Sequence, residues 1–99
     1  MVRHIVLYQL RRGADPDDLG EALSTLATID EVRNLVCGPN SSPLGLSGKW
    51  EYGLQVEFAD EAARARYMTD PQHLAVVPVV ERLTESLLVF GITSEEGTL

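Results

Sequence analysis

The chain is poor in cysteine, histidine and basic residues, and each scarcity excludes a class of protein. Cys37 is the only cysteine, so no internal disulfide can form. One cysteine and two histidines fall short of the ligand spacings of zinc sites, and we expect no metal. Eight Lys and Arg stand against fifteen Asp and Glu, which gives a net charge of −7. Because so acidic a surface repels phosphate, we expect no nucleic-acid partner.

Long apolar runs are also absent. None reaches the roughly 20 residues that span a bilayer, so no membrane partner is expected. The N-terminal apolar run over residues 2–8 is short, polar residues follow it, and it lacks a small-residue cleavage site. These features argue against a signal peptide and lead us to expect a cytoplasmic, reducing setting.

The composition is that of an ordinary globular domain. The chain has 99 residues, of which 44% are hydrophobic and 23% charged. At this length we expect a single domain over residues 1–93. Residues 94–99 are polar and are expected to form a frayed C-terminal tail.

Four segments have the pattern of β-strands. In residues 50–58 apolar side chains alternate with polar ones, which is the clearest strand signal in the chain. Residues 2–10 and 86–92 are rich in β-branched and large apolar residues, and residues 32–37 form a weaker candidate. Glycine, proline and serine crowd residues 38–48, which we expect to be a loop.

Two Asp-Pro pairs mark helix starts. Asp15 and Asp70 can cap free N–H groups, and the proline that follows each one fits the first helical turn. We expect helices over about residues 16–29 and 71–83, with a shorter helix over 59–68 before the latter. Pro78 is expected to kink the last helix.

The order of these elements predicts the fold. It is βαββααβ, which corresponds to an α+β ferredoxin-like fold with a four-stranded antiparallel sheet and helices on one face. Strand alternation turns Ile5, Leu7, Leu88 and Phe90 toward the other face. A second copy of the chain is the simplest cover, so we expect a homodimer through the sheet face.

Several segments together resemble a known family. They are residues 2–8, 38–40, 52–58, 67–73, 80–83 and 87–90, and the most specific features are His4 on the first strand and Pro71-x-His73. Over about residues 2–92 the chain resembles the stress-responsive A/B barrel (Dabb) family. The resemblance implies a dimeric α+β barrel in which two sheets pack face to face. In the plant olivetolic acid cyclase of this family, a His and a Tyr carry an intramolecular aldol reaction, and the chain matches them at His73 and Tyr67; a further His matches His4.

Each candidate catalytic residue has a structural alternative. The positive end of the helix disfavours protonation of His73 and keeps it available as a base, but its imidazole can also simply bond locally. Tyr67 can orient that imidazole or stabilise an oxyanion, but it can also be a core aromatic residue. Both interpretations stay open at this point.

We expect the ligand to be an apolar or aromatic small molecule held between sheet and helices. His4 would be a polar contact there, although a lone histidine on an apolar face is more often a core residue. No phosphate loop or cofactor motif is found, so no cofactor is expected. The residues expected to line the substrate site are His4, Val6, Tyr8, Leu54, Val56, Val79 and Leu87.

Three functional hypotheses remain. The first is a cofactor-free polyketide cyclase or lyase with His73 as base and Tyr67 as helper. The second is a non-catalytic stress-responsive dimer that binds a ligand in the same cavity. The third, a cofactor-independent monooxygenase, is favoured least because nothing in the sequence indicates oxygen chemistry. Whether the chain is an enzyme stays open.

Overall fold

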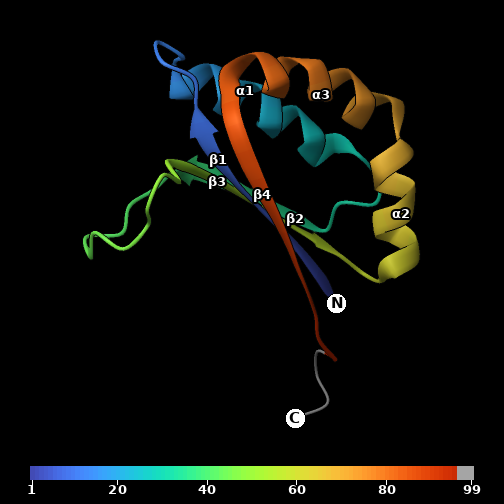
Figure 1. Cartoon of the computed structure of the whole chain (residues 1–99). Coiled ribbons are helices and arrows are strands. Elements are labelled where there is room, and N and C mark those ends of the chain that lie inside the picture. Colours follow the sequence, from blue (N-terminus) through green and yellow to red (C-terminus); the bar gives the residue numbers. More distant parts are fainter. Residues whose placement is uncertain (96–99) are drawn as a thin grey trace.

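The computed structural model describes residues 1–95, which form one sheet with helices packed on one side of it (Figure 1). The order of elements is βαββααβ, so the predicted α+β ferredoxin-like fold is confirmed. The elements are β1 (Val2–Leu10), α1 (Pro16–Ser24), the 3-10 turn η1 (Thr25–Thr28), β2 (Asn34–Pro39), β3 (Tyr52–Phe58), α2 (Glu61–Thr69), α3 (Pro71–Leu83) and β4 (Thr84–Thr93).

The four strands are antiparallel and lie in the order β2-β3-β1-β4. The long first strand is therefore central, and it pairs with β3 on one side and β4 on the other. All three helices lie over the same face, which leaves the opposite face uncovered within the protomer (Figure 1). We call this uncovered side the open face; its apolar residues are Ile5, Leu7, Val36, Leu88, Phe90 and Ile92.

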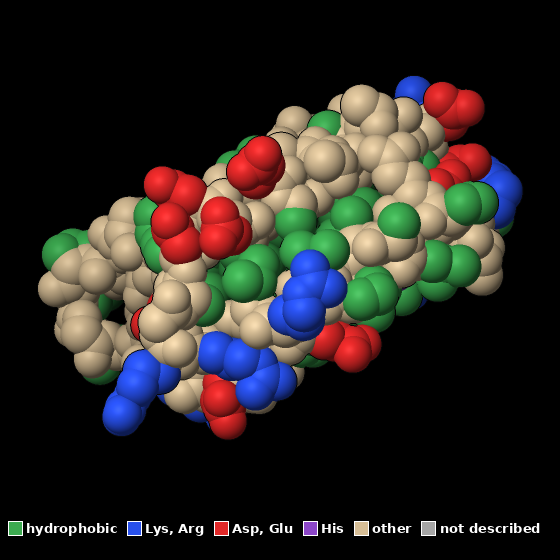
Figure 2. All heavy atoms as spheres, turned by 90° about the horizontal axis from the view of Figure 1, so that it is seen from above, with side chains coloured by type: hydrophobic (Ala, Val, Ile, Leu, Met, Phe, Trp, Pro, Cys, Tyr) green, Lys and Arg blue, Asp and Glu red, His purple; other side chains and the backbone are tan. Residues whose placement is uncertain are grey.

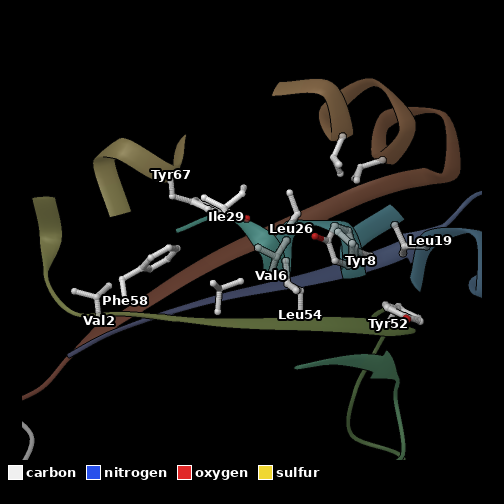
Figure 3. Close-up of a cluster of buried hydrophobic side chains, with 14 of the residues drawn as sticks. Val2, Val6, Tyr8, Leu19, Leu26, Ile29, Tyr52, Leu54, Phe58 and Tyr67 are labelled. Carbon is white, nitrogen blue, oxygen red and sulfur yellow. The ribbon is translucent and has the colours of Figure 1, made fainter. Parts of the chain in front are cut away.

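The core lies between the sheet and the helices. Alternation along β1 buries Val2, Val6 and Tyr8 on the helix side, and β3 repeats the pattern. Figure 3 shows Tyr67 and Phe58 at one end of this core and Tyr52 and Leu19 at the other. Burying one large apolar side chain contributes roughly 1.5–3 kcal/mol, so this layer holds the helices on the sheet.

Aspartate caps begin all three helices, as the Asp-Pro pairs predicted for two of them. The side chain of Asp15 accepts a hydrogen bond from the backbone N–H of Asp17, and Asp70 accepts one from Gln72. Asp60 caps α2 in the same way through Ala63. These bonds satisfy N–H groups that have no partner within a helix.

Some predicted boundaries were wrong. The helix expected over residues 16–29 is α-helical only to Ser24 and continues as the 3-10 turn η1. The hydroxyl of Thr25 donates to the Ala22 carbonyl and that of Thr28 to the Thr25 carbonyl, and such bonds compete with regular helix geometry. The second strand is shifted by two residues, and β4 begins at Thr84, directly after α3. The third strand begins at Tyr52 rather than at Trp50.

Gly20 allows α1 to approach the sheet closely. A Cβ atom at this position would lie 2.5 Å from the hydroxyl oxygen of Tyr52 on β3. Glycine inside a helix lowers its stability, and here the missing side chain makes room for the tyrosine.

The two ends of the described chain meet at the sheet. The backbone N–H of Ser94 donates to the Met1 carbonyl, and the Met1 amine donates to the Ser94 carbonyl. The other residues of the predicted tail, 96–99, lie outside the described residues. Within residues 1–95, no helix combines the length and apolarity that a membrane crossing needs.

Candidate functional site

A cavity of about 160 Å³ lies between the helix face of the sheet and the helices. In the view from above, no histidine side chain is visible at the surface (Figure 2). The residues that line the cavity come from three strands and all the helical elements: His4, Val6, Tyr8, Leu23, Leu26, Leu54, Tyr67, His73, Val76, Val77, Val80, Glu81 and Leu87.

Seven of the nine residues expected in the site line this cavity, and Val56 and Val79 do not. Val56 is fully enclosed within the core. At about 100° per residue, the cavity-lining positions of α3 cover one side of the helix and Val79 falls outside it. The seven are His4, Val6, Tyr8, Leu54, Tyr67, His73 and Leu87.

The sequence reasoning missed six lining residues, and the reasons differ between helices. Leu23 and Leu26 belong to the apolar stripe of the first helix, and that stripe was a usable signal. The third helix is apolar on most sides, so periodicity did not select its inner face. The missed residues of α3 are Val76, Val77, Val80 and Glu81.

His73 is held by a bond to the end of the preceding helix. Its Nδ1 atom lies 3.1 Å from the carbonyl oxygen of Met68. A carbonyl only accepts hydrogen bonds, so Nδ1 carries the proton and Nε2 keeps its lone pair. Burial lowers the pKa of His73, although the Met68 carbonyl and the Asp70 carboxylate act in the opposite direction. The imidazole is therefore neutral at pH 7.

Tyr67 lies at the centre of a ring cluster. Its ring centroid is 4.6 Å from that of His73, 4.8 Å from that of Phe58 and 6.2 Å from that of His4. Burial raises the pKa of Tyr67 to about 12. The phenol thus keeps its proton at neutral pH and can act as a hydrogen-bond donor.

His4 and Tyr8 add two more polar groups to the cavity. Burial lowers the pKa of His4, and the positive charge of Arg64 and the neighbouring His73 add to this effect. Burial also raises the pKa of Tyr8. Both side chains are therefore neutral at pH 7, like those of His73 and Tyr67.

The polar atoms of this cluster are available to a ligand. Within residues 1–95, the hydroxyls of Tyr8 and Tyr67 and the ring nitrogens of His4 make no hydrogen bond to the protein. No polar side-chain atom in that part of the chain is both sealed from solvent and unpaired. The hydroxyls of Tyr8 and Tyr67 and the ring nitrogens of His4 are therefore accessible, and all three residues line the cavity.

Charged groups are scarce around the cavity. Among the residues described, Glu81 is the one charged side chain on its lining. Residues 1–95 contain no group of three or more His, Cys, Asp and Glu side chains that could hold a metal ion. The arrangement offers two neutral imidazoles, two phenol hydroxyls and an apolar wall, which suits proton transfer on an uncharged ligand.

Solved structures with this fold are known. A Dabb family protein from Mesorhizobium loti with a ferredoxin-like fold is 26% identical over 95% of this chain and 96% of its own, with a TM-score of 0.79. A protein of unknown function from Jannaschia, described as dimeric and ferredoxin-like, is 23% identical over 94% and 98%, with a TM-score of 0.83. The hydroxynitrile lyase from Passiflora edulis is 14% identical over 99% and 96%, with a TM-score of 0.81. No curated protein matches the chain.

The family resemblance drawn from the sequence is confirmed. The model of the stress responsive A/B barrel domain matches residues 2–94, which is nearly the whole chain. The matched region includes the sheet, all three helices and every residue that lines the cavity. The chain therefore belongs to the stress responsive A/B barrel (Dabb) family.

Proposed function

We propose that the cavity binds a small neutral carbonyl compound and that His73 removes a proton from the carbon next to its carbonyl. The observation that carries the proposal is the bond from His73 Nδ1 to the Met68 carbonyl, which leaves Nε2 as the basic atom of a half-buried, neutral imidazole. Tyr67 donates its hydroxyl to the oxyanion that forms, and His4 is a second polar contact. No cofactor is required for enolisation.

The size of the cavity limits the ligand. Its volume of about 160 Å³ is close to that of an engineered protein cavity of about 150 Å³ that takes up benzene. A ligand of one ring, or a short chain that closes into one ring, therefore fits. A longer polyketide exceeds this volume and would have to extend out of the cavity.

A balanced test reaction follows from this size. Heptane-2,4,6-trione, a linear triketone, loses a proton from a terminal methyl group to Nε2 of His73. The resulting carbanion attacks the distant carbonyl carbon, one C–C bond forms, and the protonated His73 returns its proton to the new alkoxide. The hydroxyl so formed leaves with a ring hydrogen as one water, and enolisation of the two remaining ketones gives orcinol. A positioned base of this kind contributes roughly 10²–10⁴-fold.

The experiment measures orcinol formation by its ultraviolet absorbance with three proteins. His73→Asn keeps a side-chain N–H that can donate to the Met68 carbonyl but lacks the base, whereas His73→Ala loses both. We expect both variants to lose turnover and only His73→Ala to lose thermal stability. Full turnover by His73→Asn would refute the base role. Mandelonitrile is a second probe, because the same base and donor suit removal of a hydroxyl proton from a cyanohydrin.

A second candidate function is non-catalytic ligand binding in the same cavity. The bond between His73 and the Met68 carbonyl favours it, because this bond connects the start of α3 to the end of α2 and thereby gives His73 a structural role. In that case parent protein and His73→Asn bind orcinol equally, and neither converts the triketone. Orcinol titration followed by tyrosine NMR signals separates the two functions.

We also propose that the chain is a homodimer through the open face. Phe90 is 54% exposed and Leu88 39% exposed on this face within the protomer, and contiguous apolar surface of this kind is typical of an interface. The description of the Jannaschia protein as dimeric supports the proposal. Sedimentation equilibrium at micromolar concentration tests it, and a well-folded monomer under these conditions would refute it.

A further inference from the structure

Tyr8 has a hydroxyl that the proposed proton transfer does not use. The residue lies on the helix side of β1 and is 3% exposed. Within residues 1–95 its hydroxyl makes no hydrogen bond to the protein, yet it is not sealed from solvent. A buried phenol usually has a hydrogen-bond partner, because leaving a buried donor unpaired is costly. The hydroxyl of Tyr8 is therefore available to a group inside the cavity that Tyr8 lines.

Tyr52 is a natural comparison for Tyr8. The two residues are paired across β1 and β3, and Tyr52 is buried as well. The Tyr52 hydroxyl lies against Gly20 and interacts with the Cys37 side chain, and Tyr52 does not line the cavity. Of these two paired tyrosines, Tyr8 alone directs its hydroxyl to the site.

The Tyr8 hydroxyl and the candidate base lie on opposite sides of an apolar stretch. His4 and Tyr8 are on the same side of β1 and four residues apart, which corresponds to about 13 Å along a strand. Val6 lies between them and pairs with Leu54, and both line the cavity. In Figure 3 the side chains of Tyr67 and Tyr8 extend toward each other from opposite sides of Val6. The cavity therefore has polar groups at both ends and an apolar middle.

The hydroxyl of Tyr8 is a neutral hydrogen-bond donor at neutral pH. Burial raises the pKa of Tyr8, and the neighbouring Tyr67 adds to this rise. A phenol that keeps its proton can donate to a carbonyl oxygen or, more strongly, to an alkoxide. Among the described residues, no Lys or Arg lines the cavity to balance a carboxylate or a phosphate. These features favour a second uncharged oxygen on the ligand.

We propose that Tyr8 binds the second carbonyl oxygen of a dicarbonyl substrate, and that this second carbonyl is the one that the carbanion attacks. Tyr67 holds the carbonyl oxygen next to the carbon from which His73 removes the proton, and Tyr8 holds the oxygen at the other end. The inference rests on the proposed function and specifies its substrate class. The substrates are compounds with two carbonyls in a 1,5-relationship, which close a six-membered ring.

Heptane-2,6-dione is a probe of this class with two carbonyls and no other functional group. Nε2 of His73 takes a proton from C1, and the C1 carbanion attacks C6. One C–C bond forms, and the π electron pair of the C6 carbonyl moves onto the oxygen bound to Tyr8. Tyr8 keeps its proton and stabilises this alkoxide, which then takes the proton held by His73. The hydroxyl so formed leaves with a hydrogen of C1 as one water, which gives 3-methylcyclohex-2-enone.

The first test separates proton removal from ring closure. Proton removal is followed by NMR as deuterium exchange next to the carbonyl of heptan-2-one, which has the same seven-carbon chain but one carbonyl. Ring closure of heptane-2,6-dione is followed by the ultraviolet absorbance of the enone. In Tyr8→Phe we expect ring closure to fall about 10²–10³-fold, as after loss of an oxyanion donor. Exchange should fall much less, because heptan-2-one has no second oxygen for Tyr8.

Two further variants are the controls. Tyr52→Phe removes a tyrosine hydroxyl that lies outside the cavity, so it should keep both rates of the parent. His73→Asn lacks the base and should lose both rates. Thermal unfolding of Tyr8→Phe should occur close to that of the parent, because the ring still fills its place and the hydroxyl has no partner in the described part of the chain.

The second test measures binding without turnover. His73→Asn and the double variant His73→Asn/Tyr8→Phe are titrated with heptane-2,6-dione and with heptan-2-one, and the NMR shifts of the protein give the dissociation constants. One hydrogen bond to Tyr8 favours the diketone. Removal of the hydroxyl should therefore lower the affinity for the diketone, relative to that for the monoketone, by about two- to tenfold.

The outcomes distinguish this inference from the proposed function. A parent protein that does not exchange the protons of heptan-2-one overturns the proposed function and, with it, the role of Tyr8. Exchange without ring closure, or equal ring closure by the parent and Tyr8→Phe, overturns the role of Tyr8 alone. An unchanged ratio of affinities in the second test also overturns it, because the hydroxyl of Tyr8 then contacts no second oxygen.

Discussion

The rings of Tyr67 and His73 are in contact, with 4.6 Å between their centroids and their planes tilted by 51°, although the two residues belong to different helices. Only Asp70 separates the two helices, and it ends α2 and caps α3 at the same time. Because the junction is one residue long, the angle between the helices fixes the distance between the two rings. The candidate base and donor are thus positioned by backbone geometry as well as by packing.

The pH dependence of turnover tests the protonation states. Burial holds the pKa of His73 below the usual 6.5 and raises that of Tyr67 to about 12. Turnover therefore rises with pH through a value below 6.5, where His73 becomes neutral, and stays level through the mildly alkaline range. Turnover is measured against pH, together with NMR titration of the His73 ring. A midpoint above 6.5 would contradict a neutral base whose pKa is lowered by partial burial.

The pH dependence of stability follows from both histidines. The folded-state pKa values of His4 and His73 lie below 6.5, so the unfolded chain binds more protons as the pH falls below that value. Their contribution is complete above pH 6.5, decreases as the pH falls and levels off below the folded-state pKa values. Carboxylates titrate near pH 4, so urea unfolding between roughly pH 5 and 7 isolates the histidines. The double variant His4→Phe/His73→Asn should have a flatter profile than the parent.

Replacement of Asp70 tests the junction between the helices. Asp70→Ala removes the cap bond to the Gln72 N–H and should cost about 0.5–2 kcal/mol in the free energy of unfolding. Asp70→Asn keeps an accepting oxygen and should be nearly as stable as the parent. Both variants remove a carboxylate that raises the pKa of His73, so this pKa should fall in each. An unchanged His73 titration would show that Asp70 acts on the cap alone.

Tyr67→Phe removes the hydroxyl and keeps the ring, so it distinguishes the contributions of these two groups. The hydroxyl has no hydrogen-bond partner in the described part of the chain, so its removal should change the free energy of unfolding by less than about 1 kcal/mol. If it stabilises an oxyanion, turnover should fall about 10²–10³-fold. Tyr67→Ala, which also removes the buried ring, should cost about 3–5 kcal/mol. Equal turnover by Tyr67→Phe and the parent would leave only a packing role for Tyr67.

The sequence predicted the elements well because their signals are local. The alternation in residues 52–58 and the Asp-Pro pairs depend on neighbours in the chain, and the corresponding strand and helices are present. The end of the first α-helix could not be predicted, because the apolar stripe through Leu26 and Ile29 is equally compatible with an α-helix and with a 3-10 turn. Thr25 and Thr28 decided it through their hydroxyl bonds.

The candidate site was predicted less completely, and the third helix is the reason. The middle of this helix has valine at positions 76, 77, 79 and 80, so no polar residue there identifies the solvent-facing side. The choice of Val79 as a lining residue therefore had no pattern to support it. The strands offered a firmer rule. Once His4 was placed on the helix side, period two also placed Val6 and Tyr8 there.

The residue at position 20 influences the depth of the cavity although it does not line the cavity. Gly20 is not a lining residue, yet its missing side chain lets α1 rest against the Tyr52 hydroxyl, and Leu23 on the same helix forms part of the cavity wall. A larger residue at position 20 would lift the helix and move the wall with it, while the base, the donor and the open face keep their side chains. Relatives that differ at this one position would therefore be expected to accept ligands of different thickness while retaining the same polar groups.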